Sequence, residues 1–157
     1  MALDRRLGAA TPASELLTEL YVPRGALADF LGSVRADFRR HGVDLIYGTV
    51  RLIERDDESF LAWARQAFAC VTFNLHVAHE RLALEKAAAD MLRLIDRAIQ
   101  FNGSFYLAYH RLATRQRVEA CYPQFAEFLR LKRRYDPRQR FQSDWYRHYR
   151  QLFAAAD

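Results

Sequence analysis

The stretch Phe68-Ala-Cys-Val-Thr-Phe-Asn-Leu-His-Val77 alternates between apolar and polar side chains over most of its length. Such alternation is typical of a strand that buries one face only. One face holds Val71, Phe73, Leu75 and Val77, and the other holds Thr72, Asn74 and His76. A row of hydroxyl, amide and imidazole groups is either a solvated sheet face or the floor of a binding site. The interpretation of this face therefore depends on the parity of the other strands, that is, on which of their alternating residues point to the same side of the sheet.

Three more segments show the same alternation, at residues 17–23, 45–53 and 104–110. Two segments with apolar residues at helical spacing separate them, at residues 25–41 and about 81–100. The predicted order is therefore β-α-β-β-α-β. Because crossover connections are right-handed, this order predicts an α+β fold of the ferredoxin-like type, with a four-stranded antiparallel sheet and both helices on one face.

The chain has 157 residues, which is enough for one domain. Residues 1–16 are small and polar and are expected to form a flexible lead-in. Residues 17–112 are expected to form the core of sheet and helices, and residues 113–157 a helical extension of the same domain.

Composition and charge exclude several classes of protein. Hydrophobic residues make up 51% of the chain, yet no apolar run approaches the ~20 residues of a membrane span. The N-terminus has no apolar signal-peptide region, so we expect a cytoplasmic protein. The net charge of +5 is concentrated in residues 111–157, which hold ten Arg and one Lys against five acidic residues. This basic surface leaves a phosphate-binding role open.

The histidine and cysteine residues do not suggest a metal site. His76 and His79 would point to opposite faces of one strand, and Cys70 and Cys121 lack the spacing of metal ligands. Both cysteines are expected to be buried free thiols, with Cys70 pointing inward.

Parity places a set of recognition-type side chains on the face opposite the helices. In strand 45–53 it predicts Ile46, Val50 and Leu52 inward, and in strand 104–110 it predicts Phe105, Leu107 and Tyr109 inward. A merely solvated face would be expected to carry more Lys and Glu and fewer Tyr, Asn and His. The predicted substrate-binding residues on the outward face are Thr49, Arg51, Asn74, His76, Tyr106 and His110.

Four stretches together resemble one known family. They are Glu19-Leu-Tyr-Val-Pro-Arg24, Val50-Arg-Leu-Ile53, Gly103-Ser-Phe-Tyr-Leu-Ala-Tyr-His-Arg111, and Lys132-Arg-Arg-Tyr-Asp-Pro137 with Phe141. They look like the C-terminal, substrate-side domain of FAD-linked oxidases of the vanillyl-alcohol oxidase type, which include sugar-lactone and alditol oxidases. The resemblance covers roughly residues 17–150.

The resemblance implies a function. In such oxidases the sheet covers the flavin ring, and polar side chains on its open face hold a substrate hydroxyl against flavin N5. Arg51 matches the Arg of an E-x-R strand, Thr49 stands where that strand has Glu, and Gln139 stands where an Asn often approaches the flavin. The implied protein is part of an FAD-dependent oxidoreductase acting on an alcohol or sugar-like substrate.

The glycines argue against flavin binding by this chain alone. The six glycines never cluster into the loop that cradles a pyrophosphate. FAD is therefore expected only with a separate flavin-binding domain or subunit, and the chain is not expected to be active without one.

Two other functions remain open at this point. An RNA-recognition module has the same element order, and Phe68, Ala69, Val71 and Phe73 match its third-strand motif. Against it, Cys70 stands where a stacking aromatic belongs, and parity sends Phe73 to the apolar face. Nucleic acid is therefore not the expected partner. The other alternative is a small-molecule regulatory domain of ferredoxin-like fold.

Overall fold

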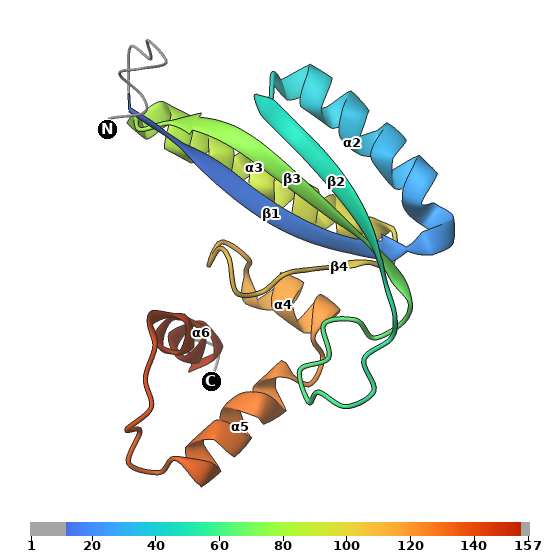
Figure 1. Cartoon of the computed structure of the whole chain (residues 1–157). Helices are drawn as coiled ribbons and strands as arrows, with labels where there is room; N and C mark the ends of the chain where they lie inside the picture. The colour runs from blue at the N-terminus through green and yellow to red at the C-terminus, as the bar shows by residue number, and fades with distance from the viewer. Residues whose placement is uncertain (1–11, 155–157) are drawn as a thin grey trace.

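The computed structural model describes residues 12–154 and shows an α+β fold (Figure 1). The strands are β1 (Ala13–Pro23), β2 (Leu45–Ile53), β3 (Phe68–Ala78) and β4 (Ser104–Phe105). A 3-10 turn, η1 (Arg24–Ala26), precedes the first of five described helices. These are α2 (Leu27–His41), α3 (Arg81–Gln100), α4 (Arg115–Cys121), α5 (Phe125–Tyr135) and α6 (Asp144–Ala154).

The four strands form one antiparallel sheet in the order β2-β3-β1-β4. The two long central strands pair from Ala13 opposite Ala78 to Pro23 opposite Phe68. Strand β1 thus begins four residues before the predicted start of the core. The predicted lead-in is therefore partly strand, and its residues 1–11 lie outside the described part of the chain.

The main core lies between the sheet and the helices α2 and α3. The helix-facing side of β3 consists of Val71, Phe73, Leu75 and Val77, as predicted, and all four are buried. Phe38 of α2 packs edge-on against Phe73, with ring centroids 5.2 Å apart. Helices α2 and α3 also contact each other, through the Arg93–Asp37 ion pair at 3.1 Å.

The helix ends explain two of the glycines. Gly42 ends α2 in the left-handed conformation, with φ 56°. After α3, Asn102 takes the left-handed conformation with φ 55°. Gly103 is needed for a different reason, because a Cβ there would lie 2.1 Å from the Tyr21 carbonyl oxygen. Helix α3 is thus followed by an Asn-Gly pair in which Asn102 takes the left-handed conformation and Gly103 allows the close approach to β1.

Strand β2 has the predicted bounds but not the predicted burial. Ile46, Val50 and Leu52 were expected inward, yet they are 45%, 46% and 65% exposed. Helix α2 packs on β1 and α3 and leaves the helix-facing side of β2 bare. A bulge between Leu45 and Tyr47 also leaves Ile46 without a partner on β3.

Strand β4 is shorter than predicted. The alternation predicted a strand over residues 104–110, but β4 contains only Ser104 and Phe105, and residues 107–109 form a turn. The Phe105 carbonyl accepts a hydrogen bond from the Tyr122 hydroxyl, and the Leu107 carbonyl accepts one from Trp145 Nε1 at 3.0 Å. The side chains of Tyr122, directly after α4, and of Trp145 in α6 thus bond to the outer edge of this segment.

The C-terminal helices pack below the β4 edge of the sheet (Figure 1). Phe125 of α5 packs against Tyr149 and Phe153 of α6, with centroids 5.2 and 5.0 Å away. Arg65, in the connection between β2 and β3, donates to the carbonyls of Asn102 and Gly103 at 3.1 and 3.2 Å. This connection is therefore fastened to the end of α3. No helix within residues 12–154 is long and apolar enough to cross a membrane.

Candidate functional site

The site lies on the sheet face opposite α2 and α3, which we call the polar face. It is defined by Glu19 of β1, by Tyr47, Thr49 and Arg51 of β2, and by Cys70, Thr72 and Asn74 of β3. The register places Tyr47 opposite Asn74, Thr49 opposite Thr72, and Arg51 opposite Cys70. The structure thus brings together three of the predicted site residues, Thr49, Arg51 and Asn74.

His76 lies farther along the same strand. It is exposed, two residues beyond Asn74, and its partner in the register is Glu15. Because alternate residues share a face, His76 lies on the same side of the sheet as Asn74, toward the end of β3.

Glu19 organises the centre of the polar face. Its carboxylate accepts hydrogen bonds from Arg51 Nη2 at 2.6 Å, from the Tyr21 hydroxyl at 3.1 Å and from the Tyr109 hydroxyl at 3.5 Å. The Glu19 side chain is 15% exposed and the Arg51 side chain 61% exposed, so the cation is the part that meets solvent. Glu19 lies opposite Thr72 of β3 and so shares this face, but it was not among the predicted site residues. The signal that could have selected it is its position on the central strand.

Cys70 is buried, as predicted, but it faces the polar side of the sheet and not the helices. Its Sγ lies 3.7 Å from Arg51 Nη2. Burial raises the pKa of the Cys70 thiol, and the Glu19 carboxylate raises it further, while Arg51 acts in the opposite direction. The inward prediction was therefore wrong in direction, because residue 70 shares the parity of Thr72 and Asn74.

The remaining donors of this cluster also stay protonated. Burial raises the pKa of Tyr21, with a further contribution from the Glu19 carboxylate. The pKa of Tyr109 is raised by the same two causes. Near neutral pH the cluster therefore holds one cation, one anion, two phenols and a thiol. Such a set can position a neutral polar ligand through hydrogen bonds, and it supplies no thiolate nucleophile.

Two buried oxygens on the polar face have no hydrogen-bond partner among the described residues. They are Thr72 Oγ1 and Asn74 Oδ1. The amide nitrogen of Asn74 is engaged, since it donates to Glu15 Oε2 at 2.6 Å. A buried polar atom left without a partner costs about 1–3 kcal/mol, and a native protein that keeps one calls for an explanation. A bound ligand that pairs with them would supply that explanation.

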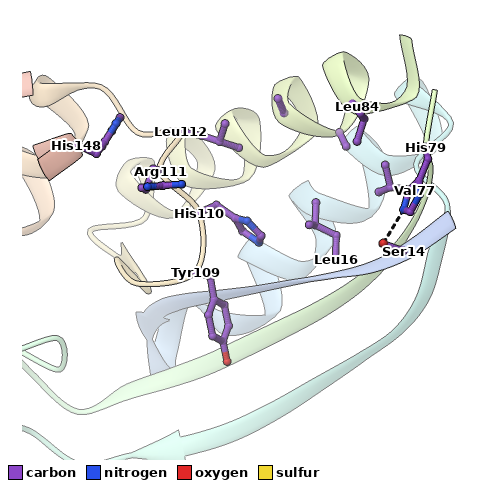
Figure 2. A pocket seen from close by; sticks show the side chains of 12 residues that line it. Ser14, Leu16, Val77, His79, Leu84, Tyr109, His110, Arg111, Leu112 and His148 are labelled. Atoms are coloured by element: carbon purple, nitrogen blue, oxygen red, sulfur yellow. Dashed lines mark hydrogen bonds between the residues drawn. The ribbon is translucent and has the colours of Figure 1, made fainter. Parts of the chain in front are cut away.

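The structure does not bring His110 to the polar face. Tyr106 packs edge-on against Tyr109 at 4.6 Å, and the Tyr109 hydroxyl reaches Glu19, although Tyr109 was predicted inward. His110 Nε2 donates to the Leu17 carbonyl at 2.7 Å and lines a pocket beside β1 and α3 (Figure 2). The turn at residues 107–109 breaks the alternation on which both predictions rested.

Gln139 also lies apart from the polar face. It has φ 48°, and its side-chain oxygen accepts a hydrogen bond from Arg150. The connection between α5 and α6 that contains it is far from the sheet (Figure 1). Within this chain, Gln139 therefore has no contact with the Arg51 cluster.

The Tyr-Asp-Pro motif has a clear structural role in that connection. The Asp136 carboxylate accepts the backbone N–H groups of Arg140 and Phe141 at 2.9 and 3.1 Å, and it pairs with Lys132. The Lys132 hydrogen bond is the main cause that lowers the pKa of Asp136. The flanking aromatics Tyr135 and Phe141 are 78% and 79% exposed. The motif thus closes a turn and displays two aromatic rings.

Residues 12–154 contain no group of three or more His, Cys, Asp or Glu side chains that could hold a metal ion. No protein-family model matches the chain, and the search of curated proteins finds no match either.

Proposed function

We propose that this chain is the substrate-side domain of an FAD-dependent oxidoreductase that acts on an alcohol or sugar-like substrate, with the flavin held by another domain or subunit. The observation that carries the proposal is the polar face: a sheet surface that α2 and α3 do not cover, with a Glu19–Arg51 pair and two unpaired buried oxygens. A substrate with several hydroxyl groups can both donate to those oxygens and accept from the guanidinium.

The order of the elements along the chain and of the strands in the sheet also supports this proposal. The elements follow the order β1-α2-β2-β3-α3-β4, and β1 and β3 are the central strands. We propose that these elements form a ferredoxin-like unit, with α4, α5 and α6 as an extension. In the oxidases that the sequence resembles, the open face of the corresponding sheet covers the flavin ring.

The residues present fit part of a flavin site. When bound, flavin would accept a hydride from the substrate carbon. Thr49, Arg51 and Asn74 would hold the substrate hydroxyl, and Glu19 would hold the Arg51 guanidinium in place. Gln139 would meet the flavin only if the partner domain carried the ring to the connection between α5 and α6.

The exposed aromatics supply a surface for the proposed flavin-bearing partner. Tyr135 and Phe141 are among the most exposed large hydrophobic side chains of the described residues. Aromatic residues are enriched at protein interfaces, where their rings bury large areas. Asp136 holds the turn that displays both rings.

The proposal is tested by NMR titration of the purified chain with xylitol, a linear polyol. We expect millimolar binding that shifts the amide signals of Thr49, Arg51, Thr72 and Asn74. Arg51→Gln should weaken binding at least fivefold, whereas the matched substitution Arg40→Gln, on the exposed side of α2, should leave it unchanged. Shifts confined to other elements, or equal binding by the two variants, would refute a substrate role for the polar face.

A second measurement tests where the flavin is held. The purified chain is mixed with FAD and passed through a desalting column. We expect no flavin absorbance with the protein, because the glycines are scattered along the chain. Retention of about one flavin per chain would contradict the need for a separate flavin-binding partner.

RNA binding is less well supported. Phe73 is buried beneath α2, and Tyr21, on the other central strand, is covered by Trp63 at a centroid distance of 5.1 Å. Base stacking on such a sheet needs exposed rings on the central strands.

A further inference from the structure

A pocket separate from the Arg51 cluster lies between the start of β1, α3 and the segment that follows β4 (Figure 2). Its volume is about 640 Å³. Pockets that take small molecules commonly measure about 300–1,000 Å³, so this one is large enough for a ligand. Tyr109 and His110 are adjacent in the chain and both line the pocket, and the Tyr109 hydroxyl also reaches Glu19 of the polar face.

The middle of the pocket is apolar. Its lining side chains are Leu16, Val77, Leu84, Ala87, Ala88 and Leu112. Leu84 is exposed to solvent at this position, so an apolar ligand would cover surface that the described residues leave open. Figure 2 shows Leu16 in the middle of the pocket, between His79 and Ser14 on one side and Arg111 and His148 on the other.

The end formed by Arg111 and His148 is electropositive. No Asp or Glu lines the pocket, and no described residue forms an ion pair with Arg111. The nearby Asp144 is already paired with Arg147. The Arg111 guanidinium is therefore available to an anion.

His148 provides an independent indication of a ligand. Its Nε2 atom is buried and has no hydrogen-bond partner among residues 12–154. Burial is the main cause that lowers the pKa of His148, and Arg111 lowers it further. The imidazole is therefore neutral at pH 7, and Nε2 can serve as a hydrogen-bond donor beside the guanidinium.

At the other end, His79 is already satisfied. Its Nε2 lies 2.7 Å from Ser14 Oγ, and its backbone N–H donates to the Pro12 carbonyl at 2.8 Å. His110 is satisfied in the same way by the Leu17 carbonyl. The unsatisfied polar groups of the pocket thus lie together at one end, next to an apolar middle.

We propose that this pocket binds an amphipathic carboxylate, with the carboxylate held by Arg111 and His148 and an unbranched hydrocarbon chain lying along Leu16, Val77 and Leu84. A guanidinium and a neutral N–H donor match the two oxygens of one carboxylate. The apolar middle excludes a compact, fully hydrophilic anion such as inorganic phosphate. This site adjoins the polar face through Tyr109, but the proposal does not depend on the proposed oxidoreductase function.

The experiment is calorimetric titration of the purified chain with decanoate, with decanol as the uncharged probe of equal chain length. We expect decanoate to bind at least tenfold more tightly than decanol. Arg111→Gln should weaken decanoate binding at least tenfold and change decanol binding less than twofold. Arg40→Gln removes the same charge from α2 and should change neither.

A filling variant tests the position of the hydrocarbon chain. Ala88 lines the pocket on α3, so Ala88→Phe should weaken both ligands at least tenfold, and circular dichroism would show whether the helices are retained. The apolar groove of Phe38, Val43 and Leu45 beside α2 is the competing site. Undiminished binding by Ala88→Phe, equal effects of Arg111→Gln and Arg40→Gln, or no measurable decanoate binding would each overturn the proposal.

Discussion

The two edges of the sheet differ in what covers them. At the β4 edge, the Tyr122 hydroxyl donates a hydrogen bond to the Phe105 carbonyl, and Trp145 Nε1 donates one to the Leu107 carbonyl. At the other edge, eight of the nine residues of β2 are exposed. Natural edge strands are usually protected by charges, prolines or bulges, and β2 has one bulge and one arginine among mostly apolar residues. The β4 edge is thus covered by side chains of the same chain, whereas the β2 edge leaves apolar side chains exposed.

The largest difference in stability between the two edges is expected when one tyrosine at each edge is replaced by alanine. Tyr122 is buried, so Tyr122→Ala should lower the free energy of unfolding by about 3–5 kcal/mol, as for other buried aromatics. Tyr47 on β2 is about half exposed, so Tyr47→Ala should cost less than about 0.5 kcal/mol. Urea denaturation measures both. A cost above about 1.5 kcal/mol for Tyr47→Ala would mean that β2 is covered in solution.

A gentler substitution isolates the hydrogen bond at the covered edge. Tyr122→Phe keeps the ring but leaves the buried Phe105 carbonyl without its donor, so it should cost about 1–3 kcal/mol. Tyr47→Phe removes the hydroxyl of a half-exposed side chain, and its effect should stay within about 0.5 kcal/mol. Equal effects of the two variants would contradict the idea that the Tyr122 hydroxyl closes this edge.

The same contrast separates what the sequence predicts from what it does not. The bounds of β2 and α3 follow from local periodicity, and the end of α3 follows from the Asn102-Gly103 pair. The early end of β4 depends on Tyr122 and Trp145, which are 17 and 38 residues away from the carbonyls that they bond. No Gly or Pro at residues 104–110 marks the turn, so parity was extended too far and misplaced Tyr109.

The candidate site divides in the same way. Thr49, Arg51 and Asn74 lie on long strands, outside the bulge of β2, where a two-residue period assigns the face. His110 follows the unpredicted turn and lies elsewhere. The exposure of β2 was missed for another reason: alternation shows which residues share a face, but not whether a helix covers that face.

A smaller effect is expected one strand in from the bare edge, where two threonines lie opposite each other. Thr72→Val removes a buried oxygen that has no partner and should stabilise the chain by about 1 kcal/mol. Thr49→Val changes the exposed partner and should stay within about 0.5 kcal/mol. Thermal unfolding measures both. Destabilisation by Thr72→Val would show that its hydroxyl is already satisfied, which would weaken the case for a ligand on the polar face.

The smallest expected effect concerns RNA. Tyr47 is an exposed ring on the polar face, whereas the central-strand rings Tyr21 and Phe73 are buried, so the sheet lacks a stacking platform. Arg133, Arg134 and other exposed arginines beside the connection between α5 and α6 would attract phosphate without sequence preference. We therefore expect weak single-strand RNA binding that Tyr47→Ala leaves unchanged.

Neutralising the basic surface should have the larger consequence. A triple variant with Arg133→Gln, Arg134→Gln and Arg138→Gln should weaken RNA binding and reduce the slope of log affinity against log salt by about 2, since each lost contact with single-stranded nucleic acid contributes about 0.7. Fluorescence anisotropy at several salt concentrations measures both quantities. Tight binding that Tyr47→Ala abolishes, with the salt slope of the triple variant unchanged, would make stacking on the sheet the main interaction. The polar face would then be a nucleic-acid surface, and the proposal of a substrate-side oxidoreductase domain would fail.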